Sequence, residues 1–176
     1  MQTKNTTSNV AHLLHDTGLA AWFGGALMGT VGLNAAASEA TDPKERAAIA
    51  DAGWVKWSPW SAAAIGAHLA GATLLTVTNR RRVVAQSGVG SMSVAKAELT
   101  AAALGVTAYA RYVGRQIEKA GRVPVDGPTR PSDETPADVA RWQQQERILQ
   151  WAVPALTGAL VVAGARMSEQ QKPGEV

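Results

Sequence analysis

The stretch Thr17–Ser38, TGLAAWFGGALMGTVGLNAAAS, decides how this chain folds. It contains 22 residues without a formal charge, between Asp16 and Glu39. An α-helix rises about 1.5 Å per residue, so a helix of this length crosses a hydrocarbon core of about 30 Å. Glycine and alanine fill the stretch, and it lacks the alternation of β-branched residues that marks a strand. The stretch therefore predicts a transmembrane helix.

Three further stretches lack charge: 23 residues between Lys56 and Arg80, 18 between Arg147 and Arg166, and 12 between Glu98 and Arg111. The 12-residue stretch is long enough to cross the membrane only if Lys96, Glu98 and Arg111 lie at the membrane interfaces. Lys and Arg allow this, because their long side chains can reach the headgroups. The fold class predicted is all-α, a four-helix transmembrane bundle with small-residue helix packing and a short interfacial helix after the first span. The predicted spans are about 17–38, 58–79, 94–113 and 148–166.

Composition bounds the alternatives. The chain has 176 residues, a formal net charge of +3, 18% charged residues and no cysteine. This length fits one domain. Because the chain has no cysteine, it can form no disulfide scaffold, no thiolate metal site and no cysteine nucleophile. The mean hydropathy of −0.06 keeps a soluble, alanine-rich helical bundle as an alternative. Soluble helices carry charge on their outer face at every turn, so charge-free runs of five or six turns favour the membrane.

The charge pattern also predicts the domain organisation. We expect a polar N-terminal tail over 1–9, one membrane domain over 10–167 with a linker at 114–135, and a polar C-terminal tail over 168–176. The first helix is predicted to begin near Ser8 or Asn9, since both are good capping residues. Gly88–Ser93 is predicted to be a flexible loop.

Two motifs are typical of helix starts. Asp42-Pro43-Lys44-Glu45 places a capping residue before proline and an acid, which predicts a short surface helix over 43–52. We expect the second spanning helix to begin separately, at Ser58 or Pro59. Thr135-Pro136-Ala137-Asp138 repeats the pattern and predicts a helix that runs into the last span. Pro154 predicts a kink in that helix near Trp151.

Small residues recur at three- and four-residue steps along the first two spans. Such stripes let another helix approach closely, within the chain or in a homo-oligomer or membrane protein partner. The predicted helix-packing residues are Gly18, Gly25, Gly29, Gly32, Ala63, Ala67 and Gly71.

Aromatic and basic residues predict contacts with the lipid bilayer. Tryptophan and tyrosine concentrate at headgroup level, so we expect interfacial anchors, with an aromatic ligand platform as the alternative for the tryptophan cluster. The predicted anchors are Trp54, Trp57, Trp60, Tyr109, Tyr112 and Trp151. Arg80, Arg81 and Arg82 directly follow a span and predict lipid headgroup contacts on the cytoplasmic side. This basic cluster is short and lacks interleaved aromatics, which argues against nucleic acid binding.

Three histidines are the candidates for cofactor chemistry. His68 lies near the middle of the second span, where an ionisable residue is costly and indicates a functional site. It could bind haem or a metal ion or relay a proton, with His15 or His12 contributing. Alternatively, its ring bonds to Asn34, Thr73 or a backbone carbonyl. We expect no cofactor, because His12 and His15 are predicted to lie too near the surface to supply a second ligand.

A motif in the first helix suggests a family. His12-x-x-His15-x-x-Gly18-Leu-Ala-x-Trp22-Phe23-Gly24-Gly25 resembles the opening helix of copper-resistance D-type and related small bacterial four-helix membrane proteins. The resemblance implies a four-helix membrane fold. Copper chemistry is not implied, because the Met- and His-rich ligand clusters of copper handling are missing from the sequence.

The predicted function follows from these patterns. No nucleophile–base constellation, carboxylate pair or phosphate loop is evident, so we do not expect an enzyme. The prediction is a multi-pass protein of the bacterial inner membrane with both termini cytoplasmic, acting as a non-enzymatic structural or partner-binding subunit. The alternatives are a haem-binding, metal-binding or proton-relaying protein centred on His68, and a soluble bundle. A bacterial source is favoured by the abundance of alanine and the preference for arginine over lysine.

Overall fold

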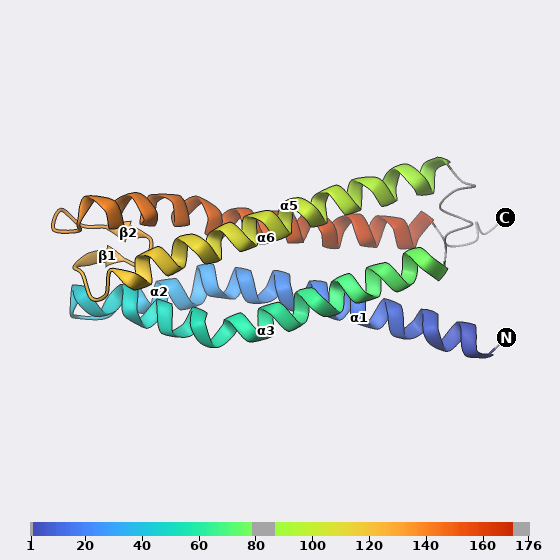
Figure 1. The fold of residues 1–176 in the computed structure, drawn as a ribbon, viewed down its shortest axis with the longest axis horizontal. Helices are drawn as coiled ribbons and strands as arrows, with labels where there is room; N and C mark the ends of the chain where they lie inside the picture. The colour runs from blue at the N-terminus through green and yellow to red at the C-terminus, as the bar shows by residue number, and fades with distance from the viewer. Residues whose placement is uncertain (1, 79–86, 171–176) are drawn as a thin grey trace.

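A computed structural model describes residues 2–78 and 87–170, with side chains over 6–78 and 92–166. Four long helical segments dominate it (Figure 1). Helix α1 (Gln2–Met28) continues through a π-helical turn, η1 (Gly29–Leu33), into α2 (Asn34–Ser38). The other three are α3 (Pro43–Thr78), α5 (Ser87–Lys119) and α6 (Ala137–Gln170). The four-helix fold predicted from the charge-free stretches is therefore confirmed.

The helices run antiparallel and form a ring that is open on one side. Helix α1 packs along α3, α5 packs along α6, and α1 and α6 join the two pairs. Helices α3 and α5 contact each other only sparsely. We call the gap between them the α3–α5 seam.

A small antiparallel hairpin closes the end of the bundle where α2 meets α3. Strand β1 (Val125–Gly127) pairs with β2 (Arg130–Pro131). The fully buried Gln143 of α6 donates Nε2 to the carbonyl oxygens of Gly127 (3.1 Å) and Pro128 (3.0 Å). The predicted linker 114–135 is thus corrected: α5 extends to Lys119, and the segment after it contains this hairpin.

The buried core is thin. A cluster of buried apolar side chains joins α1, α5 and α6, namely Leu19, Trp22, Ala26, Ala103, Val153 and Leu160. Only 11% of the most apolar 18-residue window of α3 is buried. Large apolar side chains therefore face outward along the bundle, among them Trp60, Val77 and Ile148.

Three helical segments within the described residues are long and apolar enough to cross a membrane: Thr6–Ser38, Pro43–Thr78 and Ala137–Arg166. Helix α5, which contains the predicted span 94–113, is not among them. Its charged and polar residues interrupt the apolar stretch, as Lys96, Glu98 and Arg111 show.

Helix α3 corrects two predictions. No separate surface helix over 43–52 exists, and no new helix begins at Ser58 or Pro59, because α3 is continuous from Pro43 to Thr78. Proline removes one backbone N–H, but tertiary packing overrides that local cost. Trp54 and Trp57 fit against α1 just before Pro59, and Ala64 does so just after it.

Three other helix ends also differ from the predictions. Helix α1 begins at Gln2 and not near Ser8 or Asn9, so the predicted tail 1–9 is almost wholly helical. Gly88–Ser93 lies inside α5 and is not a loop. Helix α6 begins at Ala137, one residue after the start that the capping motif predicts, and passes Pro154 to reach Gln170. The predicted tail 168–176 is therefore helical over its first three residues.

The charge-free stretches of α1 and α3 are staggered. Gly25 lies against Trp57, and Gly18 lies against the backbone of Ala64 and His68. Residues 58–78 therefore lie opposite the part of α1 that precedes Gly25, and Asp51 lies level with the C-terminal half of the stretch 17–38. The short turn between Ser38 and Pro43 fixes this register, because it leaves the two helices no freedom to slide.

Candidate functional site

A cavity of about 550 Å³ lies inside the bundle beside the α3–α5 seam. All four helical segments and the hairpin loop contribute to its wall. This volume is within the range of about 300–1,000 Å³ typical of small-molecule sites. The apolar part of the wall includes Trp22, Trp54, Trp57, Ile65, Leu104 and Val153.

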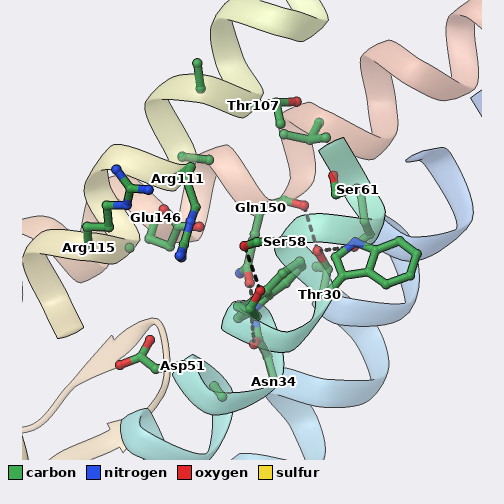
Figure 2. A pocket seen from close by; sticks show the side chains of 18 of the residues that line it. Thr30, Asn34, Asp51, Ser58, Ser61, Thr107, Arg111, Arg115, Glu146 and Gln150 are labelled. Carbon is green, nitrogen blue, oxygen red and sulfur yellow. Dashed lines mark hydrogen bonds between the residues drawn. The ribbon is translucent and has the colours of Figure 1, made fainter. Parts of the chain in front are cut away.

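A hydrogen-bond network fixes the wall on the α1 side (Figure 2). Asn34 accepts from Trp54 Nε1 at Oδ1 (3.1 Å) and donates Nδ2 to Gln150 Oε1 (2.8 Å). Gln150 Nε2 in turn donates to Thr129 Oγ1 (3.2 Å). The Thr30 hydroxyl lies 2.7 Å from the carbonyl oxygen of Gln150. The network thus links α2, α3, α6 and the hairpin loop through side chains.

The π-helical turn η1 places part of this network. Thr30 belongs to η1, and Asn34 directly follows it. A π turn adds a residue to a helical turn and is frequent at functional sites. Thr30 and Asn34 lie four residues apart, and both bond to Gln150.

Four charged residues also line the cavity. Asp51 comes from α3, Arg111 and Arg115 from α5, and Glu146 from α6. Figure 2 shows the arginines with Glu146 on one side of the opening and Asp51 on the other. Within the described part of the chain, no ion pair within 4 Å joins any two of them. The cavity wall therefore holds two acidic and two basic side chains that do not form ion pairs with one another.

Polar atoms without partners gather at the same cavity. In the described residues, four buried side-chain atoms lack a hydrogen bond: Trp22 Nε1, Thr107 Oγ1, Gln143 Oε1 and Glu146 Oε2. Three of these residues, Trp22, Thr107 and Glu146, line the cavity. A buried polar group without a partner costs about 1–3 kcal/mol, so three residues of this wall carry polar atoms whose hydrogen bonds the described part of the protein does not supply.

Most of this site does not follow from the sequence patterns. Trp54 and Trp57, for which the sequence predicts interfacial anchors or, alternatively, a ligand platform, line the cavity. Gly25 and Gly29 make room for them, since a methyl group at either glycine would overlap an indole ring. The spacing of Arg111 and Arg115, four residues apart on one helix face, was the available signal.

His15 and His68 form a second cluster, at the contact between α1 and α3. Their ring centroids lie 4.4 Å apart, and only 6% of His15 and 1% of His68 is exposed. His68 Nδ1 lies 3.1 Å from the carbonyl oxygen of His15, one of the partners that the sequence left open. The expected surface position of His15 is therefore wrong. Gly18 and Gly71 allow the close backbone contact that buries it.

The histidine pair does not form a full ligand set. His12 is exposed, and His15 Nδ1 lies 2.7 Å from Asp16 Oδ1. No group of three or more His, Cys, Asp or Glu residues gathers for a metal ion in the described ranges. As packed, the two imidazole rings leave no space for a porphyrin between them. Of the other expected partners, Asn34 bonds to Trp54 and Gln150, and Thr73 to the backbone of Leu69.

The remaining predicted residues fall in several places. Gly32 contacts only Met28 of its own turn, Ala63 is exposed and Ala67 is half-buried, so Ala64 and His68 mark the contact face of α3 with Gly71. Glu98 is exposed on α5. Arg80, Arg81 and Arg82 lie outside the described residues. The outward-facing aromatics, with between 45% and 69% of their surface exposed, are Trp60, Tyr109, Tyr112 and Trp151.

Comparisons with models of protein families, with curated proteins and with solved structures found no match to this chain. The resemblance of residues 12–25 to copper-resistance D-type proteins stays a prediction. The candidate site is accordingly interpreted from its own geometry and chemistry.

Proposed function

We propose that this chain is a multi-pass protein of a bacterial cytoplasmic membrane that acts by binding, without catalysis, and takes an amphiphilic ligand into the cavity beside the α3–α5 seam. The observation that carries the proposal is the cavity wall, where three buried polar atoms lack partners next to an aromatic surface. Apolar walls with a few convergent polar groups are typical of small-molecule sites.

The apolar exterior supports the membrane location. Three helices have the length and composition of spans, and large apolar side chains face outward on them. For α5 we propose a crossing that depends on the other helices, since its polar residues Thr107 and Arg111 line the cavity. Four crossings place both termini on one side, and the three arginines at 80–82 favour the cytoplasm for that side.

Extraction of isolated membranes tests the location. Sodium carbonate at high pH releases peripheral proteins and leaves integral ones in the bilayer, so we expect the chain to require detergent. Release by carbonate alone would favour the soluble, alanine-rich bundle.

Tryptophan quenching tests ligand entry. A background with Trp60, Trp142 and Trp151 replaced by Phe keeps only the cavity residues Trp22, Trp54 and Trp57. In nanodiscs of brominated-chain phospholipid, we expect strong quenching of these three. Ser61→Phe fills the cavity and should reduce the quenching at least twofold. Ala63→Phe, on the exposed face of the same helix, is the matched control and should leave it unchanged. Equal quenching in both variants would overturn the proposed binding site.

The contact between His15 and His68 supports a second candidate, a proton- or metal-binding role centred on His68. The packed rings make haem the least favoured form of this role. The purified protein should then lack a Soret band and should bind a soft divalent ion such as Cu²⁺ in a manner abolished by His68→Ala. Unaltered ion binding in His68→Ala would remove this candidate, and a Soret band lost in that variant would restore haem.

A further inference from the structure

The charged wall of the cavity indicates which amphiphile it takes. We propose that the cavity recognises a glycerophospholipid whose headgroup carries both a phosphate and a primary ammonium, the chemistry of phosphatidylethanolamine. This inference rests on the proposed function and specifies its ligand. Its observation is the set of two acidic and two basic side chains that face one cavity without pairing with each other.

Opposite charges around a half-buried cavity ordinarily pair, because an uncompensated charge away from water is costly. Asp51, Glu146, Arg111 and Arg115 instead stay apart, on three different helices. A ligand with one sign of charge would neutralise half of this set and leave the other half uncompensated. A ligand with both signs satisfies both halves.

The arginines provide the phosphate side. Arg111 and Arg115 lie four residues apart on the cavity face of α5, and neither makes a hydrogen bond or ion pair with a described residue. A guanidinium matches two phosphate oxygens through parallel N–H donors. Arg115 is exposed and Arg111 half-buried, so the pair leads from the surface into the cavity.

The carboxyl groups provide the ammonium side. Oε2 of Glu146 is buried without a partner, and Asp51 faces the same cavity from α3. A primary ammonium offers three N–H donors, which suits two carboxyl groups on different helices. A quaternary ammonium, as in phosphatidylcholine, has no N–H to donate and should bind less well.

The rest of the cavity suits the apolar part of such a lipid. Trp22, Ile65 and Leu104 form a wall next to the charged groups. Because α3 and α5 contact only sparsely, the seam lets acyl chains extend toward the bilayer while the headgroup stays inside. A lipid could thus enter sideways without leaving the membrane.

Native mass spectrometry of the whole protein tests the proposal without any substitution. The protein is released from nanodiscs of equal parts phosphatidylethanolamine, phosphatidylglycerol and phosphatidylcholine, matched in acyl chains, and the retained lipid is measured. We expect phosphatidylethanolamine to be retained about tenfold over each of the others, the effect of one charge-assisted hydrogen bond. Equal retention, or a preference for phosphatidylglycerol, would overturn the proposal.

Variants separate the two halves of the site. Arg111→Gln with Arg115→Gln should lower retention of all three lipids, because each carries a phosphate. Glu146→Gln with Asp51→Asn should lower phosphatidylethanolamine about tenfold and leave phosphatidylglycerol unchanged or higher. Arg141→Gln and Asp133→Asn, both exposed and outside the cavity wall, are single-charge controls of the same substitution type. An unchanged ratio in the carboxyl variant, with its helical circular dichroism intact, would contradict the ammonium side.

The outcome also separates this inference from the function on which it rests. Bromine quenching that Ser61→Phe abolishes, together with equal retention of the three headgroups, would defeat the inference alone. Quenching that Ser61→Phe does not affect, together with no retained lipid, would defeat the proposed function itself.

Discussion

The indole N–H of Trp54 donates a hydrogen bond to Asn34 Oδ1 across 3.1 Å, and this bond fastens α3 to the end of the first helix. Asn34 simultaneously donates to Gln150 of α6, so one amide joins three helices at the cavity wall. Only 8% of Asn34 is exposed. A buried amide satisfied in this way stabilises one arrangement of the helices over others, because any shift leaves polar atoms without partners.

Replacing Asn34 should therefore destabilise the bundle. Asn34→Ala removes both bonds and leaves Trp54 and Gln150 without partners, a loss of about 2–3 kcal/mol. Unfolding by sodium dodecyl sulfate in mixed micelles, followed by circular dichroism, measures it. Asn9→Ala, on the exposed first part of α1, should stay within about 0.5 kcal/mol of the native chain. Equal stability of the two variants would show that the network contributes nothing.

The close contact between Gly25 and Trp57 predicts that alanine substitutions at Gly24 and Gly25 have different effects on stability. Gly25→Ala places a methyl group inside the ring of Trp57 and should cost about 1–3 kcal/mol. Gly24→Ala meets no atom within 4 Å and should be neutral or stabilising by up to about 1 kcal/mol, since alanine favours a helix. The same micelle titration compares them. Trp57→Leu should recover part of the stability lost in Gly25→Ala. If it does not, overlap with the Trp57 ring is not the cause of the loss.

The histidine cluster predicts unequal roles for two nearby histidines. His68→Ala removes a ring packed against His15 and Trp22 and leaves the His15 carbonyl without that partner, which should cost about 2–4 kcal/mol. His12→Ala changes an exposed side chain and should have an effect within about 0.5 kcal/mol. Thermal unfolding in detergent measures both variants. A similar loss of stability in the two variants would mean that the burial of His68 does not cause the destabilisation.

The sparse contact between α3 and α5 predicts that a cross-link between these two helices blocks ligand entry. Because the chain has no cysteine, Ala62→Cys on α3 and Ala108→Cys on α5 introduce its only two thiols, both at the cavity wall. A thiol-reversible cross-linker between them should reduce bromine quenching of Trp22, Trp54 and Trp57 at least twofold, and a reductant should restore it. Each single-cysteine variant treated in the same way is the control. Full quenching in the cross-linked protein would place lipid entry elsewhere.

Part of this architecture is predictable from local sequence. Charge-free stretches predict the long helices, and the Thr135-Pro136 motif predicts the start of α6 to within one residue. These features are local, because helix length and capping depend on residues a few positions apart. The same local rules fail at Pro59, where contacts of Trp54, Trp57 and Ala64 with α1 hold one helix together across the proline.

Local sequence is thus sufficient to predict four helices, long apolar stretches and the lack of thiol chemistry. Contacts between distant residues, in contrast, determine which face of each helix is inside. The register of α1 against α3 turns Trp54 and Trp57 inward and buries His15 against His68. It also brings Asp51 to the cavity that Arg111 and Glu146 reach from two other helices. The cavity depends on contacts between residues as far as 120 positions apart, which no local periodicity encodes.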